Sequence, residues 1–339
     1  MQRQGAGAVY LNIFHPDVVE FLSTKKENAD EKVRMKTLSL GLIVPDKYYE
    51  LIKKNETMYL FSPHDVQKVY NKAFSEINIT EEYDNMVANP NITKSKIKAR
   101  DLETEISKLQ QESGYPYILN IDTANRSNPI HGTIKMSNLC SEILQVQDKS
   151  ELNADLSYKT LGTDISCNLG STNIANLIHA PNFEKSVETM VRALTFVSDS
   201  TDLEEVPTVQ KGNELRHTIG LGAMGHHSAM AVNKIRYESE EGVEFTDAYF
   251  RTLSYYAIKA SNTIARERKE SFYEFEKSKY ADGTYFDKYL DAPEFEMKSE
   301  AVKKALKDVP VPSKKDWEAL RNDIMKYGMY NAYLLAIAP

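Results

Sequence analysis

The residues best suited to chemistry are an amide, a thiol and a carboxylate at alternate positions of one short segment. Asn138, Cys140 and Glu142 lie at i, i+2 and i+4 within residues 137–142 (SNLCSE). In an extended chain this spacing puts all three side chains on one face, with successive members roughly 6.6 Å apart. That face suits chemistry on a polyol, because the amide and the carboxylate hold hydroxyl groups while the sulfur reaches a carbon between them. The alternative is a buried structural cysteine with polar loop neighbours.

The chain has two cysteines, Cys140 and Cys167. Two cysteines cannot form a disulfide scaffold, and the first residues (MQRQGAGAVY) lack the apolar stretch of a secretory signal. We therefore expect a cytoplasmic protein, in which free thiols are either buried small hydrophobic groups or reactive groups. No metal site is expected, because neither H-E-x-x-H nor C-x-x-C occurs and the adjacent His226 and His227 face different directions.

Composition excludes several classes of protein. The chain has 339 residues, a formal net charge of −7 and 41% hydrophobic residues, enough for one large domain or two ordinary ones. The acidic balance argues against a nucleic-acid-binding surface, which needs a basic face. The sequence has no apolar run of about 18 residues, so no transmembrane helix is expected.

Hydrophobic periodicity and turn residues predict alternating strands and helices, and hence a mixed α/β architecture. We expect strands at residues 9–14, 38–44, 57–61, 115–121, 216–221 and 333–338. We expect helices at residues 16–25, 63–77 (capped by Ser62), 100–112 (ended by Gly114), 181–198, 246–269, 301–307 and 316–326. The helix at 181–198 should bury one face made of Phe183, Val187, Met190, Val191, Leu194 and Val197.

Both ends of the sequence are abrupt. The chain begins inside RQGAGAVYLN with no preceding helix or cap, and it stops at Pro339 directly after an apolar predicted strand. A natural domain rarely ends by exposing such a strand edge. We therefore expect the sequence to be one piece of a larger protein.

Two further motifs compete for a functional interpretation. Residues 220–225 (GLGAMG) match the G-x-G-x-x-G pattern of dinucleotide-binding folds, but the acidic residues about 20 positions on lie in a polar stretch without a clear strand. A lone glycine pattern is weak, and close backbone packing at a strand end explains it better. The adjacent Tyr255 and Tyr256 lie in an amphipathic helix and are interpreted as core residues.

The segment S-N-L-C-S-E-I resembles the cysteine motif of ribonucleotide reductase large subunits, and the resemblance spans nearly the whole chain. The other matching stretches, in the family's order, are RQGAGAVYLNIFHPDVVEFL, YLFSPHDV, DISCNLGSTNIANL, RHTIGLGAMG, DWEALRNDI and MYNAYLLAIAP. The R-Q-G-A-G-A and C-N-L-G-S-T-N forms are most similar to class Ib enzymes. The resemblance implies an incomplete ten-stranded α/β barrel over residues 1–339, with Cys140 on a loop that threads the barrel.

The resemblance also assigns roles to individual residues. Cys140 would become the thiyl radical that removes the ribose 3′ hydrogen, Glu142 would accept the 3′ hydroxyl proton, and Asn138 would hydrogen-bond the ribose. Cys167 would be one of two thiols that supply reducing equivalents. The substrate-binding segment would comprise Ser137, Asn138, Leu139, Cys140, Ser141 and Glu142, joined by Pro339 at the start of a diphosphate loop. Arg3 and Gln4 match the loop that relays effector identity to base choice.

The same resemblance implies the partners. The substrate would be a ribonucleoside diphosphate, and the chain itself would bind no cofactor or metal. The radical would come from a metal-containing small (beta) subunit, and the reductant would be a thioredoxin- or glutaredoxin-like protein. The full-length subunit would be a homodimer regulated by nucleoside triphosphate effectors, with no nucleic acid or membrane involved.

The chain departs from the family by what it lacks. The second reducing thiol precedes residue 1 in the family, and the radical-transferring tyrosines and the C-terminal cysteines follow residue 339. The alternative function is therefore a non-catalytic fragment of a split or interrupted large subunit, which needs its other segments for activity.

Overall fold

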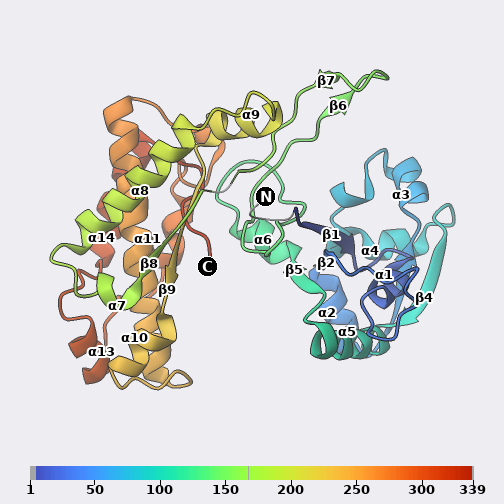
Figure 1. Cartoon of the computed structure of the whole chain (residues 1–339), viewed down its shortest axis with the longest axis horizontal. Coiled ribbons are helices and arrows are strands. Elements are labelled where there is room, and N and C mark those ends of the chain that lie inside the picture. The colour runs from blue at the N-terminus through green and yellow to red at the C-terminus, as the bar shows by residue number, and fades with distance from the viewer. Residues whose placement is uncertain (1–4, 167, 338–339) are drawn as a thin grey trace. The chain divides into compact units, whose positions relative to one another are not determined.

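The computed structural model describes residues 5–166 and 168–337, which fold into two compact units (Figure 1). Unit 1 comprises Met1–Asn128 and Thr133–Leu144, and unit 2 comprises Pro129–Gly132 and Gln145–Pro339. Helices and strands alternate in both units, which confirms the mixed α/β class. The interpretation of residues 1–339 as a single incomplete domain stays a prediction.

Unit 1 contains a three-stranded parallel sheet in the order β1-β2-β5 and an antiparallel pair β3-β4. Its strands are β1 (Gly7–Asn12), β2 (Leu38–Val44), β3 (Thr57–Phe61), β4 (Lys94–Lys98) and β5 (Tyr117–Asn120). Its α-helices are α1 (Val18–Ser23), α2 (Asp46–Lys54), α3 (Pro63–Tyr70), α4 (Ile79–Ala88), α5 (Ala99–Ser113) and α6 (Ile121–Ser127). The central strand β2 is nearly continuous apolar sequence (LSLGLIV), as expected for a strand covered on both faces.

Helix ends in unit 1 follow their capping residues. The Ser62 hydroxyl accepts a hydrogen bond from the Asp65 amide at the start of α3, as the sequence predicts. The same helix ends at Tyr70 rather than at residue 77, because Asn71 adopts a left-handed conformation (φ 52°) and stops it. Gly114 ends α5 in the same way, at φ 76°, as predicted.

Unit 2 is built around the parallel pair β8-β9, which lies beside the long helices α8 and α11 (Figure 1). Its strands are β6 (Glu151–Leu152), β7 (Tyr158–Thr160), β8 (Asn168–Asn173) and β9 (Ile219–Met224). Its α-helices are α7 (Ile174–Leu177), α8 (Phe183–Ser200), α9 (Pro207–Arg216), α10 (His226–Val232), α11 (Glu240–Arg268), α12 (Asp287–Leu290), α13 (Glu300–Ala305) and α14 (Lys314–Tyr327).

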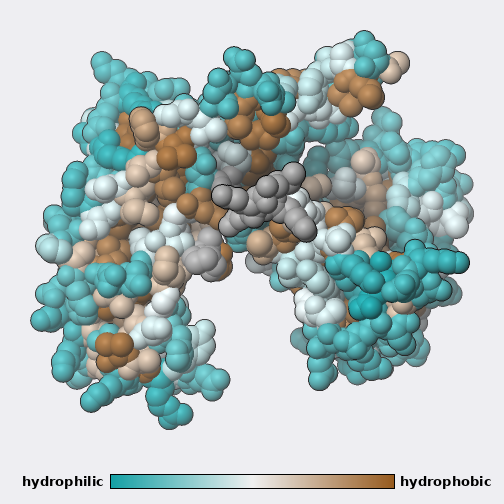
Figure 2. Space-filling model, viewed as in Figure 1, coloured by the Kyte–Doolittle hydropathy of each residue, from teal (hydrophilic) through white to brown (hydrophobic). Residues whose placement is uncertain are grey.

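Helix α8 buries most, but not all, of its predicted apolar face. Phe183, Val187, Val191 and Leu194 are buried, whereas Val197 is 48% exposed. Thr195 and Ser198 take the inward positions instead, because their hydroxyls hydrogen-bond the buried Asn331 and Asn213. On the face seen in Figure 2, hydrophobic residues show along α8 among hydrophilic neighbours.

The glycine motif at 220–225 is part of a strand. Its first five residues lie in β9, paired in parallel with β8, and only Gly225 turns the chain at φ 77° before α10. The backbone N–H and C=O groups of this strand form hydrogen bonds within the sheet, so the motif does not form a phosphate-binding loop. This geometry supports the backbone-packing interpretation and contradicts the dinucleotide one.

The predicted strand at 333–338 is wrong as a regular element. Within its described part, Leu335 forms one isolated bridge with Leu221, and Ile219 and Leu221 donate their amides to the carbonyls of Tyr333 and Leu334. The segment therefore runs beside β9 with too few ladder hydrogen bonds to count as a strand. The described sheets close no barrel.

The adjacent tyrosines of α11 are core residues, as predicted. Tyr255 and Tyr256 are each 8% exposed, and the Tyr255 ring meets Trp317 of α14 edge-on at 5.0 Å. Among the described residues, no helix combines the length and the apolar character needed to cross a membrane.

Candidate active site

Cys140 lies in a tight turn of unit 1. The Ser141 amide donates to the carbonyl oxygen of Asn138 at 3.2 Å, which closes a four-residue turn with Cys140 in its third position. Ser141 has φ 64°, a left-handed conformation that residues other than glycine rarely adopt. The extended conformation that would place alternate side chains on one face is therefore wrong for this segment, although its position in a loop is confirmed.

Hydrogen bonds on both sides of the turn hold it in place. The Asn138 side-chain oxygen accepts from the Ile143 amide at 3.1 Å, and the Ser137 hydroxyl donates to the Ile143 carbonyl at 2.8 Å. Ile143 itself is 5% exposed, so the turn is anchored to the core just beyond Glu142. Asn138 is thus both a turn residue and a candidate ligand of substrate.

The three predicted groups keep functional atoms free of described partners. Cys140 is an exposed free thiol. The Glu142 Oε2 atom is buried and accepts no hydrogen bond from any described residue. The Asn138 side-chain nitrogen likewise donates to none of the residues that the structure describes. Because buried polar groups in proteins are normally paired, an orphaned carboxylate oxygen beside an exposed thiol indicates a site for a hydrogen-bonding ligand.

A tyrosine of the parallel sheet contacts the turn, because the Tyr10 hydroxyl donates to the Asn138 carbonyl oxygen at 2.7 Å. The Tyr115 hydroxyl, just before β5, lies 3.1 Å from the hydroxyl of Ser39 in β2. Burial, followed by the hydrogen bond and charge of Tyr115, raises the pKa of Tyr117.

The structure describes one group of predicted site residues, and the others lie outside the described residues. Residues 137–142 form the continuous turn region of unit 1. Arg3, Gln4, Cys167 and Pro339 lie outside the described residues. Their assigned roles stay predictions.

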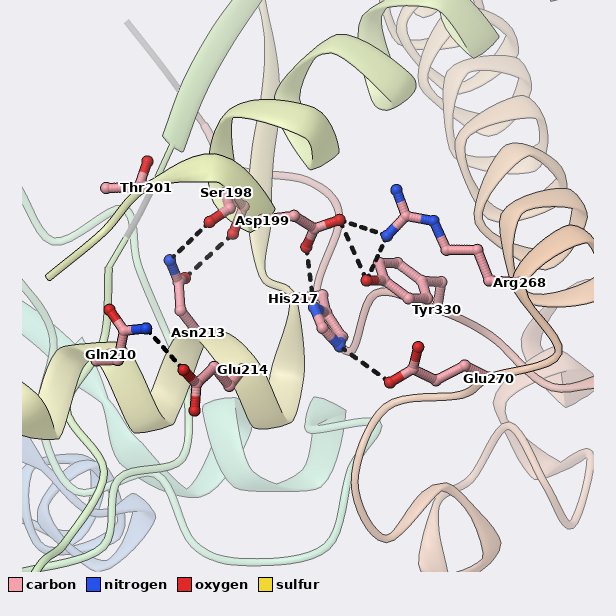
Figure 3. Close-up of a pocket in the computed structure, with 10 residues that line it drawn as sticks. All are labelled: Ser198, Asp199, Thr201, Gln210, Asn213, Glu214, His217, Arg268, Glu270 and Tyr330. Carbon is pink, nitrogen blue, oxygen red and sulfur yellow. Dashed lines mark hydrogen bonds and ion pairs between the residues drawn. The ribbon is translucent and has the colours of Figure 1, made fainter.

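Unit 2 holds a second polar site that the sequence did not predict (Figure 3). It is a pocket of about 370 Å³. Its lining residues are Ser198, Asp199, Thr201, Gln210, Asn213, Glu214, His217, Arg268, Glu270 and Tyr330. They come from α8, α9, α11 and the segments that follow α8, α9, α11 and α14, which explains why no local sequence motif revealed them.

Asp199 is the centre of that pocket's hydrogen-bond network. Its carboxylate accepts from His217 Nδ1 at 3.0 Å, from the Tyr330 hydroxyl at 3.1 Å and from Arg268. Burial alone would raise the pKa of Asp199, but the bonds and charges of His217 and Arg268 outweigh it and hold the pKa below its usual value. Burial and the Asp199 charge raise the pKa of Tyr330 to about 12.

Aromatic stacking completes the network. The His217 ring stacks on Tyr330 at 4.1 Å, and the Arg268 guanidinium lies 4.4 Å from the same ring. His217 Nε2 is 4.0 Å from Glu270, so both imidazole nitrogens face carboxylates. No cluster of metal-binding side chains occurs within the described ranges. The arrangement is that of a mutually satisfied charge network.

The chain is similar to proteins of one known family along its whole length. The profile of the family described as "Ribonucleotide reductase, barrel domain" matches residues 1–339. The chain is 49% identical to the ribonucleoside-diphosphate reductase subunit alpha of Mycoplasma pneumoniae over 343 residues, covering 100% of this chain and 47% of that protein. It is 43% identical to the subunit of the same name from Bacillus subtilis over 340 residues, covering 100% of this chain and 48% of that protein. The chain therefore spans about half the length of the curated relatives it matches.

Proposed function

Since this chain belongs to the ribonucleotide reductase barrel-domain family, we propose that it is the catalytic core of a subunit that reduces ribonucleoside diphosphates to 2′-deoxyribonucleoside diphosphates. The observation that carries the proposal is the Cys140 turn. It presents an exposed thiol beside a buried carboxylate oxygen and an amide nitrogen that have no described partner. A ribose fits these groups, because its adjacent hydroxyls can hydrogen-bond the carboxylate and the amide while the sulfur reaches a carbon-bound hydrogen between them.

Each group of the turn has a defined role in the proposed reaction. The Cys140 thiyl radical takes the ribose 3′ hydrogen atom, forming S–H and leaving a carbon radical. Glu142 accepts the 3′ hydroxyl proton, because an anionic oxygen beside the radical promotes loss of the 2′ hydroxyl as water. Asn138 donates its free amide hydrogens to the ribose and so fixes the ring relative to the sulfur.

The reducing equivalents come from thiols. Cys167 and a second cysteine outside this chain each give up one hydrogen and form a disulfide. One of these hydrogens protonates the leaving 2′ hydroxyl to complete the water, the other goes to the 2′ carbon, and Glu142 returns its proton to the 3′ oxygen. The hydrogen atom on Cys140 then returns to the 3′ carbon, which restores the thiyl radical. A thioredoxin- or glutaredoxin-like protein reduces the disulfide after turnover.

The other parts of the proposed complex follow from the family. A metal-containing small subunit would supply the radical to Cys140, and Pro339 would open the loop that binds the diphosphate. Arg3 and Gln4 connect nucleoside triphosphate effectors to base choice in a dimeric, cytoplasmic enzyme. The relatives are about twice as long as this chain, so the assay supplies the remaining segments and the small subunit.

The test measures deoxyribonucleoside diphosphate formation by the chain joined to those segments, together with the small subunit. Wild-type protein turns over, whereas Cys140→Ser falls by more than about 10³-fold, because a serine oxygen radical is far harder to generate. Tyr49→Phe, which removes a hydroxyl group from the surface of α2, is the matched control and stays at the wild-type rate. The isolated chain without added segments should show no turnover. If Cys140→Ser retained a tenth of wild-type turnover, the proposed function would be wrong.

A further inference from the structure

We propose that Tyr10 of β1 is a positioning residue that fixes the direction of the Cys140 turn. Its hydroxyl donates to the Asn138 carbonyl oxygen at 2.7 Å and lies 2.5 Å from the Ser141 hydroxyl oxygen. Tyr10 therefore contacts the first and the last residue of the turn, and Cys140 lies between the two points of attachment. The effect on turnover rests on the proposed function, whereas the effect on the turn does not.

Gly41 in the neighbouring strand leaves room for the Tyr10 ring. Tyr10 of β1 pairs with Gly41 of β2, which pairs in turn with Tyr117 of β5, so the three residues form one row across the sheet. A Cβ atom at Gly41 would lie 2.3 Å from the Tyr10 ring, closer than real Cβ contacts allow. Only glycine at this position lets the ring lean across the neighbouring strand.

The turn needs an external support because little else holds its tip. Cys140 is exposed, and Asn138, Leu139 and Ser141 are only half-buried. Ser141 also adopts a left-handed conformation, which is unfavourable for residues that have a Cβ atom. A hydrogen-bonding group on a strand is a rigid support, because the strand is fixed by its own ladder.

The direction of the sulfur matters more for reaction than for binding. Hydrogen-atom transfer requires the sulfur at one distance and angle from the ribose carbon, and small displacements reduce the rate strongly. Substrate binding instead relies on the Asn138 and Glu142 side chains and on groups outside the turn. Loss of the Tyr10 hydroxyl should therefore lower kcat and leave KM nearly unchanged.

The first experiment measures amide hydrogen exchange in the full 339-residue chain. The Ser141 and Ile143 amides both donate to Asn138, so their exchange reports whether the turn is closed. In Tyr10→Phe, which keeps the ring over Gly41, these amides should exchange at least about fivefold faster, because the hydroxyl contacts to Asn138 and Ser141 are both lost. Amides of β2 should exchange at the wild-type rate, which shows that the sheet is intact.

The matched control is Tyr49→Phe in the same unit. The Tyr49 hydroxyl donates to the Asn120 side-chain oxygen at 2.7 Å, away from the turn, so this variant should leave exchange at Ser141 and Ile143 unchanged. Unchanged turn exchange in Tyr10→Phe would overturn the proposal. So would an equal acceleration throughout β2, because that result indicates a loss of overall stability.

The second experiment separates positioning from folding in the assembled enzyme. Pre-reduced enzyme forms product in a single turnover, whose amplitude counts active sites and whose rate reports chemistry. Tyr10→Phe should leave the amplitude and KM at wild-type values and lower the rate about tenfold. A lower amplitude at an unchanged rate would mean that Tyr10 only stabilises the fold, and the proposal would fail.

A double variant identifies the atoms involved. Ser141→Ala should accelerate turn exchange in the wild-type chain and add nothing further in the Tyr10→Phe background, because both changes remove the same contact. Fully additive effects would contradict the proposal. Absence of turnover in the wild-type assembly would count against the proposed function alone, since exchange of the turn amides still tests Tyr10.

Discussion

The Cys140 turn of unit 1 and the Asp199 pocket of unit 2 both gather polar side chains, and they differ in where those groups find hydrogen bonds. In the pocket, the Asp199 carboxylate accepts from His217, Arg268 and Tyr330 (Figure 3). In the turn, the hydrogen bonds run mainly through the backbone and the Tyr10 hydroxyl, and a carboxylate oxygen of Glu142 is left without a described partner.

Under the proposed function, this difference distinguishes groups that stabilise the fold from groups that would bind the substrate. A carboxylate with three donors contributes to folding, and its charge is already neutralised by its neighbours. A buried oxygen without a donor costs free energy in the empty protein and regains it when a hydroxyl binds. Removal of single groups should therefore change catalysis in the turn and stability in the pocket.

After Cys140→Ser, the largest expected effect is again on catalysis, at Glu142. Glu142→Gln keeps the shape of the side chain and removes the base, so turnover in the assembled enzyme should slow by about 10²–10⁴-fold. Steady-state kinetics with a ribonucleoside diphosphate measure this change, and KM should stay near its wild-type value. A loss of less than tenfold would mean that another group accepts the proton.

A smaller effect is expected at Asn138. Asn138→Ala should reduce kcat/KM by an amount equivalent to about 1–3 kcal/mol, because it removes hydrogen bonds to the ribose and to the Ile143 amide. Asn138→Asp keeps the acceptor for Ile143 and loses only the donor nitrogen. If the aspartate variant shows wild-type kinetics, the amide donor has no role in holding substrate.

In the pocket, the effect should fall on stability. Asp199→Asn should lower the free energy of unfolding by about 2 kcal/mol at pH 7, because the charge that pairs with Arg268 and His217 is lost. Urea unfolding of the 339-residue chain measures the change. Asp202→Asn, at an exposed neighbouring position, is the matched control and should change stability by less than about 0.5 kcal/mol. Equal effects of the two variants would contradict the network.

The smallest effect is the pH dependence of the difference in unfolding free energy between wild type and Asp199→Asn. The pKa of Asp199 is depressed in the folded state, so its contribution is fully present above the unfolded-state pKa of about 4. The contribution is lost as the pH falls through the lower folded-state pKa. The stability difference between wild type and Asp199→Asn should therefore be present at pH 5 and should shrink as the pH falls below about 4. A difference that grows as the pH falls below about 4 would contradict the direction of the shift.

Elements set by neighbouring residues could be predicted from the sequence. The strands at Leu38–Val44 and Thr57–Phe61 match their predicted bounds, and Ser62 and Gly114 cap their helices as expected. Strand alternation, caps and left-handed glycines depend on contacts within a few positions. The errors at Val197 and at residues 333–338 arise where distant segments decide which side chains are buried and which amides are paired.

The sequence by itself determined the family and suggested which groups react, because S-N-L-C-S-E-I and the other motifs are carried by residue types in order along the chain. Only the tertiary structure decided how the Cys140 turn is attached to the sheet, since the hydrogen bond that joins them comes from Tyr10, 128 positions away. The same holds for the Asp199 network, whose bond to Tyr330 spans 131 positions. Contacts of such separation leave no local pattern, and they exist only once folding has brought the segments together.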